Sequence, residues 1–437
     1  MSSYALTSSV SPCRSRSLLR LWLGYGAYAL GAAVIGLTVV VYAHLLDIGA
    51  LLLVRAQQTR PWIPLLVTPA TGAVSAWLTR KYFRGAEGSG IPQVIAALRS
   101  NSSQSAADLM QTKIVVGKIL VSWLALAGGL TIGREGPSVH IGAAVMFNLR
   151  HLHPRRVSQD ARIALERSLL LAGAACGLAA AFDTPLAGFV FAFEQLCGRS
   201  MRLPLKVMAM TIALSTSVTR AIDGNYTFFA SLRPLEFPAV ESMTAVFALS
   251  IVTGAVGGAF AWLFANSERW LPSFLNSMRA KTPLAFGALC GLVVAVIGYV
   301  SEWHTVGSGY AEASGIIGGH IALPTAYPIL KIASLLASSL VGAPGGIFVP
   351  TLAIGAGIGD LLHTLMPVVP LHAAIALAMV GYLSSVTQKP ITAFVIVMEM
   401  SNMHALLFPL MAVAFIASAV SRAFTTPLYE TLSLRYR

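Results

Sequence analysis

A glutamate follows an arginine in the middle of a long apolar stretch, in the segment Gly133-Arg134-Glu135-Gly136-Pro137. A predicted helix over residues 138–148 begins directly after it. An ionisable side chain at membrane depth is costly, so it is a candidate for an ion pathway. The exposed amides and positive dipole end of a helix N-terminus favour anions, so Glu135 could occupy an anion site and leave it when protonated. The segment therefore predicts an anion gate.

The overall composition predicts an all-α polytopic membrane protein. Hydrophobic residues make up 56% of the 437 positions and charged residues only 11%, and apolar runs recur from about residue 21 to the end. The net charge of +13 comes from basic residues in short hydrophilic breaks, which favours a membrane topology over a nucleic-acid partner. The first apolar run, residues 21–53, is too long for a signal peptide and is expected to remain as a membrane helix.

Glycine and proline interrupt the apolar runs more often than simple spanning helices would require. Several predicted segments are shorter than the roughly 20 residues that cross a hydrocarbon core. Half-helices that end inside a membrane occur where their backbone is buried or lines a cavity, and their N-termini then form anion sites. The predicted helical segments are residues 21–54, 61–83, 113–132, 137–149, 166–181, 185–198, 204–222, 241–266, 284–301, 323–341, 350–365, 371–386, 390–401 and 403–423. This pattern is typical of transporters and channels.

Two basic breaks, at residues 150–167 and 199–206, are expected to face the cytoplasm. The predicted organisation is a basic cytoplasmic N-terminal segment over residues 1–20 and one membrane domain over residues 21–437. Both termini are expected to be cytoplasmic. A bacterial inner membrane is the expected location, because the chain is compact and shows no targeting element.

Three landmarks recur in the same order along the chain and predict an internal repeat. Gly88-Ser89-Gly90-Ile91-Pro92 is echoed by Gly307-Ser308-Gly309-Tyr310, residues 133–143 by residues 346–357, and residues 184–194 by residues 389–399. The offsets are 219, 213 and 205 residues. Such an ordered set predicts two halves of inverted topology with the substrate site between them. The predicted halves are residues 61–222 and 241–423, followed by a C-terminal helix over residues 424–434.

Four of these features together resemble the anion-coordinating motifs of the CLC family of chloride channels and chloride–proton antiporters. They are Gly88-Ser89-Gly90-Ile91-Pro92, Gly133-Arg134-Glu135-Gly136-Pro137, Gly346-Ile347-Phe348-Val349-Pro350, and Tyr429 in the last helical segment. The resemblance implies that each motif opens a helix whose N-terminus faces the ion. It also implies a homodimer in which each subunit holds a complete pathway. The chain ends eight residues after Tyr429, so the prokaryotic form without nucleotide-sensing domains is expected.

The resemblance also implies a role for each motif residue. Ser89 would donate its hydroxyl to a central anion, and Tyr429 would donate its phenolic hydroxyl from the inner side. Ile347 and Phe348 would donate backbone amides, and Glu135 would be the external gate. The anion-binding set implied by the motifs is Ser89, Gly90, Ile91, Arg134, Glu135, Gly136, Ile347, Phe348 and Tyr429.

Lys118 stands at the position of a buried lysine in the family and would add positive potential to the pathway. Its alternative is to extend along apolar surface to a membrane interface. His140, five residues past Glu135, does not share its helix face and is assigned no role.

Serine at position 89 accompanies chloride in the family, so chloride and similar small monovalent anions are the expected substrates. No metal or cofactor is expected, because Cys13, Cys176, Cys197 and Cys290 lack metal-ligand spacing. A membrane-embedded enzyme is the distant alternative. The chain has no His-Glu-x-x-His, no paired aspartates and no Gly-x-Ser-x-Gly, so we expect no enzymatic activity.

Proton coupling is left open by the segment Phe193-Glu194-Gln195-Leu196. Proton-coupled members of the family have a second glutamate at the position of Gln195, and an amide cannot take up and release a proton at physiological pH. Either Glu194 or water carries the proton, which makes the protein a chloride–proton antiporter, or coupling is lost. We expect the second outcome, a channel-like pathway, passive or weakly coupled and gated by Glu135.

Overall fold

The structure is a computed structural model that describes residues 12–152, 158–198, 205–224, 228–229, 241–365, 367 and 369–436, with side chains from residue 25 onward. Parts of the two basic breaks, residues 153–157 and 199–204, lie outside the described residues, as do residues 1–11 of the predicted N-terminal segment. The described residues are almost entirely helical, which confirms the predicted fold class.

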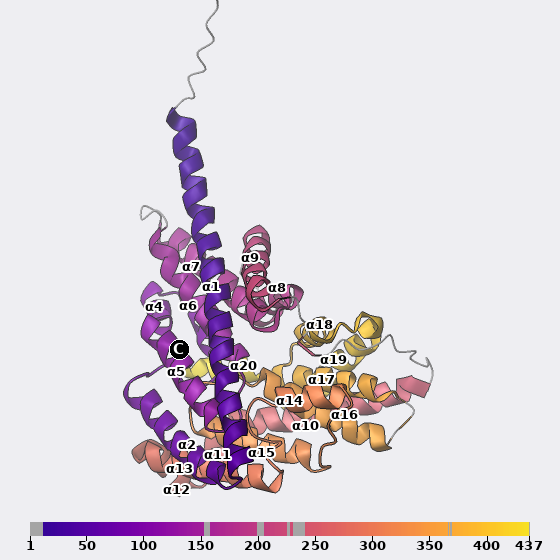
Figure 1. Cartoon of the computed structure of the whole chain (residues 1–437). Coiled ribbons are helices and arrows are strands. Elements are labelled where there is room, and N and C mark those ends of the chain that lie inside the picture. The colour runs from indigo at the N-terminus through magenta and orange to yellow at the C-terminus, as the bar shows by residue number, and fades with distance from the viewer. Residues whose placement is uncertain are drawn as a thin grey trace, which may run out of the picture.

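The first half of the chain forms one long helix followed by helices of very unequal length (Figure 1). They are α1 (Pro12–Thr59), α2 (Ile63–Lys81), α3 (Ile91–Arg99), α4 (Ser103–Leu109), α5 (Thr112–Ala127), α6 (Glu135–Asn148), η1 (Leu149–Leu152), α7 (Gln159–Phe182), α8 (Pro185–Phe191), the π-turn η2 (Ala192–Leu196) and α9 (Leu205–Asp223).

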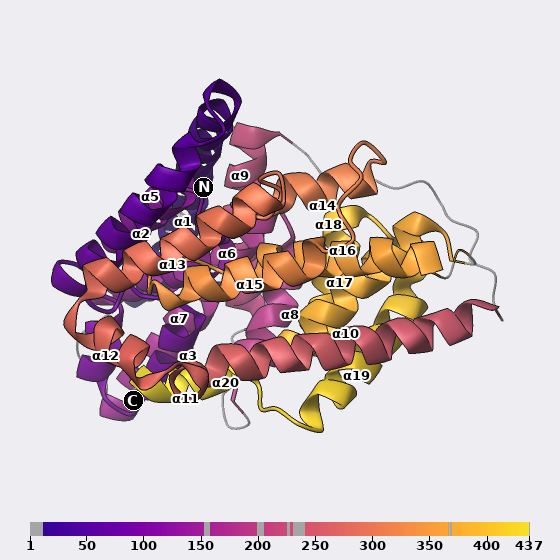
Figure 2. The same ribbon diagram turned by 90° about the horizontal axis from the view of Figure 1, so that it is seen from below.

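The second half lies beside the first and repeats this order of long and broken helices (Figures 1 and 2). It comprises α10 (Glu241–Ala265), α11 (Ser267–Trp270), α12 (Ser273–Lys281), α13 (Pro283–Val300), α14 (Tyr310–Ile317), α15 (Tyr327–Leu340), α16 (Phe348–Leu365), α17 (Leu371–Thr387), α18 (Pro390–Ser401), η3 (His404–Leu406) and α19 (Leu407–Arg422). The chain then returns to the first half, where α20 (Leu428–Ser433) packs on α3 and continues into η4 (Leu434–Tyr436).

Eight of the described helices are long and apolar enough to cross a membrane, so the protein is a multi-pass membrane protein. Several apolar helices are too short to cross alone, among them α17 and α18. The short helices α3, α4, α12 and α14 lie where no helical segment was predicted, because seven to nine residues are too few to show a clear apolar period.

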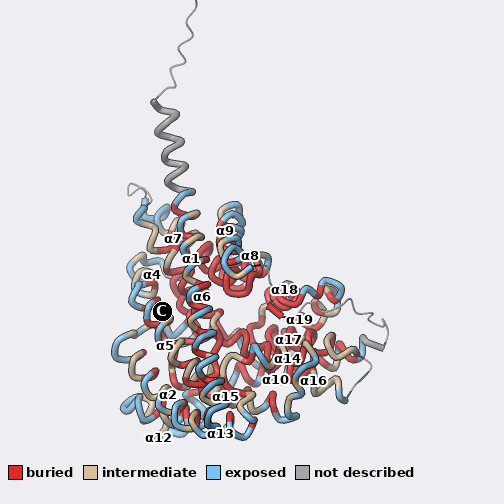
Figure 3. Tube along the Cα trace, viewed as in Figure 1, coloured by how far each residue is buried: buried red, intermediate tan, exposed pale blue. Residues whose placement is uncertain are grey.

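Each half has a helix with a long buried stretch, and buried segments gather in the interior of the molecule (Figure 3). Residues 169–182 of α7 and residues 373–387 of α17 are buried without a break. Both stretches are rich in alanine and other small residues, which let neighbouring backbones approach closely. Gly142 of α6 meets Gly173 of α7, and Gly355 of α16 meets the backbone of α17 in the same manner.

The two halves contact each other in the reciprocal way that a pseudo-two-fold axis produces. Where α2 crosses α13, a Cβ on Gly72 would lie 2.5 Å from the Gly287 carbonyl oxygen, and a Cβ on Gly287 would lie 2.5 Å from the Gly72 carbonyl oxygen. Outside this crossing, Gly36 of α1 packs on α9 and Gly254 of α10 packs on α19. α1 and α10 thus make the same kind of glycine contact, each with the last long helix of its own half.

A carboxylate from each half caps the start of a helix in the other half. Glu194 accepts hydrogen bonds from the amides of Ile391 (3.1 Å) and Thr392 (2.6 Å) in the first turn of α18. Glu399 accepts from the amides of Leu186 (3.2 Å) and Ala187 (2.8 Å) in the first turn of α8. Both helices begin at a proline, which has no N–H to satisfy. The side chains of Thr184 and Lys389, which precede these helices, make no capping hydrogen bond. Because each carboxylate meets exposed amides and a positive dipole end, the two caps join the halves.

Removing either cap should weaken the joint between the halves. We expect Glu194→Ala and Glu399→Ala each to lower stability by about 1–2 kcal/mol, because two first-turn amides lose their acceptor. The thermal unfolding midpoint in detergent measures this loss. Glu268→Ala, at an exposed position of α11, is the control and should leave the midpoint unchanged. If both cap variants unfold at the same midpoint as this control, the two caps do not stabilise the contact between the halves.

Candidate functional site

Two glycines at equivalent positions of the two halves are bonded directly to each other. The amide of Gly133 donates to the Gly346 carbonyl and the amide of Gly346 donates to the Gly133 carbonyl, both at 2.7 Å. A further bond of 3.2 Å runs from the Gly345 amide to the Gly88 carbonyl. Three of the sequence motifs, which lie up to 258 residues apart in the chain, are thereby brought together at one place.

The helices that begin at this place present backbone amides without intrahelical partners. The first amides of α6 belong to Glu135 and Gly136, and those at the start of α16 belong to Phe348 and Val349. Each helix then has a proline, Pro137 or Pro350, which has no N–H to satisfy. The two N-termini are thus suited to bind an anion.

The Glu135 carboxylate lies directly against the paired glycines. A Cβ on Gly133 would be 2.3 Å from Glu135 Oε2, and a Cβ on Gly346 would be 3.1 Å from the same atom. The side chain is buried, and backbone amides at the starts of α6 and α16, that of Val349 among them, reach its carboxylate. The carboxylate therefore occupies a position that also suits an anion.

Ser89 reaches the same place from α3. Gly90 has a φ of 97°, a left-handed conformation that glycine adopts without strain, and this turn starts α3 at Ile91. The Ile91 amide donates to Ser89 Oγ at 3.3 Å, which leaves the hydroxyl hydrogen available for a further acceptor. A Cβ on Gly136 would lie 2.7 Å from the Ser89 Cβ, so the two motifs touch.

Tyr429 approaches from α20. Its ring stacks on Phe348 with centroids 6.0 Å apart, and Phe348 in turn contacts Phe191 edge-on at 6.3 Å. The Tyr429 hydroxyl is buried, and its polar neighbour is the Ser89 side chain. The hydroxyls of the first and the last motif are thereby brought together.

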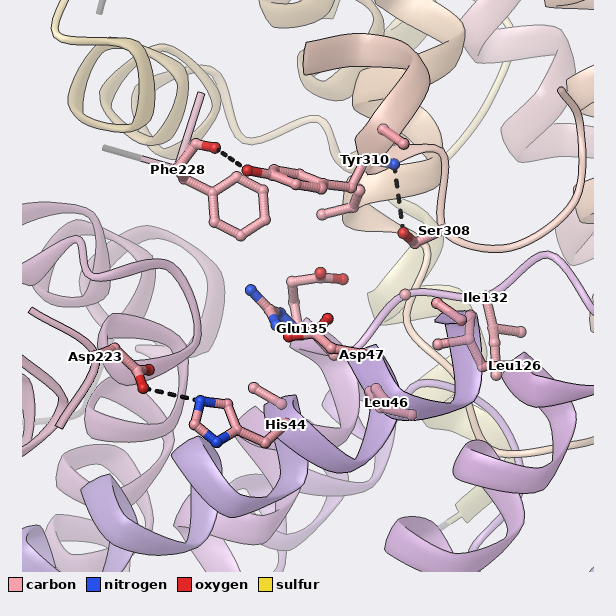
Figure 4. A pocket seen from close by; sticks show the side chains of 16 residues that line it. His44, Leu46, Asp47, Leu126, Ile132, Glu135, Asp223, Phe228, Ser308 and Tyr310 are labelled. Carbon is pink, nitrogen blue, oxygen red and sulfur yellow. Dashed lines mark hydrogen bonds and ion pairs between the residues drawn. The ribbon is translucent and has the colours of Figure 1, made fainter. Parts of the chain in front are cut away.

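An outer cavity of about 430 Å³ opens on one side of Glu135 (Figure 4). Arg134 turns its guanidinium into this cavity, 3.8 Å from the Asp47 carboxylate and 5.3 Å from the Phe228 ring centroid. His44 Nε2 lies 2.9 Å from Asp223 Oδ1. The Arg134 side chain therefore belongs to the outer approach and not to an ion pair with Glu135, its sequence neighbour.

An inner cavity of about 120 Å³ lies on the other side of the paired glycines. Ser89, Ile347 and Tyr429 line it together with Arg279 of α12 and Arg435 of η4. Ile132 borders both cavities, so the motif residues form the short barrier between them. Glu135 therefore faces the outer cavity and Tyr429 the inner one.

Two buried lysines hold the turns that precede α3 and α14. Lys118 Nζ donates to the carbonyls of Ala86 (2.9 Å) and Gly88 (3.1 Å). Lys331 Nζ donates to the carbonyls of Thr305 (2.9 Å), Val306 (3.3 Å) and Gly307 (3.2 Å). Lys118 is fully buried and does not reach an interface. Lys331 was missed in the sequence, although the offset of 213 residues from Lys118 repeats the offset of the second motif.

Residues at the edge of the predicted site have other surroundings. Gln195 is buried in η2, and its Nε2 has no partner in the described part of the chain. Glu194 points away toward the start of α18, where its carboxylate is occupied by two amides. His140 packs beside Gly90, and its Nε2 lies 2.9 Å from the Leu109 carbonyl oxygen. The described residues contain no group of three side chains that could hold a metal ion.

Broken helices with converging N-termini, two halves related by a pseudo-two-fold axis and a barrier between two cavities define an ion channel or transporter. Residues 71–422 match the family described as voltage gated chloride channel. Since this match spans most of the chain, the protein belongs to that family, which confirms the resemblance seen in the motifs. Members of this family are channels or transporters, so the enzyme alternative is excluded.

The chain is also similar to individual members of the family. It is 28% identical over 400 residues to the H(+)/Cl(-) exchange transporter ClcA of Salmonella arizonae, covering 89% of this chain and 82% of that protein. Its fold matches a slow cyanobacterial Cl-/H+ antiporter with a TM-score of 0.80 at 21% identity, over 94% of this chain and 97% of the other. A CLC-type fluoride/proton antiporter matches with a TM-score of 0.74 at 21% identity, over 93% of this chain and 97% of that one.

The packing of Glu135 against Gly133 generates a prediction. Gly133→Ala should push the carboxylate out of its position, because the added methyl would overlap Oε2. We expect the variant to lose most of the difference in chloride flux between acidic and neutral pH, as measured in liposomes. Gly346→Ala, whose Cβ would lie 3.1 Å from the same oxygen, should have a smaller effect. A full pH response in Gly133→Ala would show that the carboxylate does not need this position.

Proposed function

We propose that this protein exchanges chloride for protons across a membrane, with Glu135 as the group that links the two ions. The observation that carries the proposal is the buried Glu135 carboxylate at the converging starts of α6 and α16, between an outer and an inner cavity. In this proposal chloride and similar small monovalent anions bind to hydroxyl and amide hydrogens. Ser89 and Tyr429 supply the hydroxyls, and the helix starts at Gly90, Ile91, Arg134, Gly136, Ile347 and Phe348 supply backbone positions around the ion.

The gate works by competition between two negative charges. When Glu135 is ionised, its carboxylate takes the place of an anion at the converging helix starts. When a proton neutralises it, that attraction falls and the side chain swings into the outer cavity. Chloride transport should therefore rise as the pH on the outer side falls, and each opening brings one proton to the site.

Passive or weakly coupled conduction, the expectation drawn from Gln195, is the less well supported alternative. The relatives reported above are named as exchangers, and the cyanobacterial protein with the same fold is named as an antiporter. Chloride–proton exchange, the alternative that the sequence leaves open, is therefore the function that we propose. Gln195 then means that the inner half of the proton route does not depend on a second carboxylate at that position.

We infer that water carries the proton on the inner side. Glu194 is an unsuitable carrier, because both of its oxygens accept bonds from first-turn amides of α18 and a proton would break that cap. Gln195 is buried next to it with an unpartnered amide group, which can bind a water molecule but cannot itself titrate. Lys118 keeps the turn before α3 in place and adds positive potential near the anion.

We propose that the protein is a homodimer in a bacterial inner membrane, with both termini in the cytoplasm. The exposed apolar side chains of α8, α9 and α19, which include Leu186, Ile222, Phe408 and Phe415, support a contact between subunits within the lipid. Arg279 and Arg435 at the inner cavity support a cytoplasmic assignment of that side, because basic residues accumulate there.

The decisive test is a simultaneous record of chloride and protons in liposomes that contain the purified protein. An imposed chloride gradient should drive protons against their own gradient, because each protonation of Glu135 is tied to anion movement. Glu194→Gln keeps an acceptor oxygen for the α18 cap and removes the titratable group, so its ratio of protons to chloride should equal that of the wild type. Chloride movement without proton movement in the wild-type protein would return the assignment to a passive pathway.

Glu135→Ala separates the gate from the conduction path. We expect chloride flux to persist, the pH dependence of that flux to vanish and proton movement to stop, because no carboxylate competes for the site or accepts a proton. The flux is measured at about pH 4.5, close to ordinary carboxyl titration, and at about pH 7.5, well above it. Asp47→Asn removes a carboxylate from the same outer cavity and should retain both the pH response and proton movement. A Glu135→Ala variant that still responds to pH would contradict the gate.

A further inference from the structure

Tyr429 is carried by α20, a helix of six residues that packs on α3. A helix this short has little stability of its own. The Tyr429 hydroxyl has the Ser89 side chain as its polar neighbour at the inner cavity. Its position depends on this contact, on the Phe348 ring and on what the rest of α20 binds.

The next residue, Glu430, joins α20 to two other elements. Glu430 Oε2 lies 3.3 Å from Arg99 Nη2 in the last turn of α3, and Lys389 Nζ donates to Glu430 Oε1 at 3.0 Å from the residue before α18. The Lys389 side chain is only 16% exposed, and Glu430 is the carboxylate that pairs with it among the described residues. We refer to these three side chains as the Arg99–Glu430–Lys389 bridge.

The bridge connects parts that the anion site depends on. α3 carries Arg99 at its end, and its start follows Ser89 in the site itself. Lys389 precedes α18, whose first amides are capped by Glu194 from the other half. One carboxylate therefore ties the helix of Tyr429 both to the helix of the Ser89 motif and to the joint between the two halves.

We propose that the Arg99–Glu430–Lys389 bridge is the positioning device that holds the Tyr429 hydroxyl at the inner end of the anion site and so keeps chloride and proton movement coupled. Exchange requires that the inner side stays closed while the outer side is open. A displaced Tyr429 leaves the inner side open whatever the state of Glu135, and chloride then passes without a proton. The proposal rests on the exchange function proposed above, and Glu430 acts in it through Tyr429 without touching the anion.

The charge of Glu430 is the property that the bridge uses. Burial raises the pKa of the Glu430 carboxyl, but its hydrogen bonds and ion pairs with Lys389 and Arg99 outweigh burial and hold that pKa below its ordinary value. The bridge therefore stays intact at neutral pH. Loss of the bridge should change the ratio of protons to chloride. The pH response of chloride flux, which depends on Glu135, should stay unchanged.

The test compares four variants of the full-length protein in liposomes: Glu430→Gln, Tyr429→Phe, the double variant, and Asp108→Asn. We expect Glu430→Gln to lower the proton-to-chloride ratio about twofold to fivefold, the range that a partly exposed ion pair supports. Tyr429→Phe should lower the ratio too, and the double variant should match Tyr429→Phe alone, because Glu430 acts through the hydroxyl. Asp108→Asn removes an exposed carboxylate from α4, which neighbours α3, and should keep the wild-type ratio.

Two results would overturn the bridge. One is an unchanged ratio in Glu430→Gln when the wild type exchanges. The other is a fall of the same size when Glu430→Gln is added to Tyr429→Phe, because Glu430 would then act by a separate route. If Glu430→Gln does not fold, Lys389→Gln and Arg99→Gln each open half of the bridge and should each produce part of the effect. A wild type that moves no protons contradicts the exchange function instead, so the two failures are distinguishable.

Discussion

The two hydrogen bonds between Gly133 and Gly346 are the contact around which the site is built. These residues are equivalent positions of the two halves, so their mutual pairing at 2.7 Å lies on the pseudo-two-fold axis. α6 and α16 begin two residues after the pair, and their free amides are thereby aimed at one point. A Cβ on either glycine would meet the Glu135 carboxylate or the Gly136 amide nitrogen. The close approach of two backbones, more than any side chain, determines where an anion can sit.

Around this pair, the polar groups divide into those that build the scaffold and those proposed to move ions. Lys118, Lys331, Glu194 and Glu399 are held by backbone carbonyls or amides, and each does the same task as its counterpart in the other half. The Glu135 carboxylate, by contrast, meets backbone amides at two converging helix starts, and the Tyr429 hydroxyl meets the Ser89 side chain. In the proposed function these two groups lie on the route of the ion. The bonds that build the scaffold are symmetric, whereas the groups proposed to move ions break the symmetry.

That asymmetry bears on coupling. The outer end has a titratable carboxylate, and the inner end has a tyrosine whose helix is tied down by an ion-paired glutamate at its surface. Gln195 predicts that chloride and proton movement are not coupled, but only if the proton must pass between two carboxylates. In the proposed function, water completes the proton route of a site that has one carboxylate and a positioned inner hydroxyl.

The sequence by itself determined the fold class, the repeat and the motif residues, because apolar runs, prolines at helix starts and glycine-rich turns are local signals. Glu135, Ser89 and Tyr429 could be named from their motifs alone. Tertiary structure decided their partners: that Gly133 bonds Gly346, that Glu194 caps α18, that Arg134 faces Asp47, and that Glu430 joins Arg99 to Lys389. The two residues of each pair are separated by 41 to more than 300 positions in the sequence. The separation of two residues in the sequence does not predict such contacts, because only the packing of the two halves brings the partners within bonding distance.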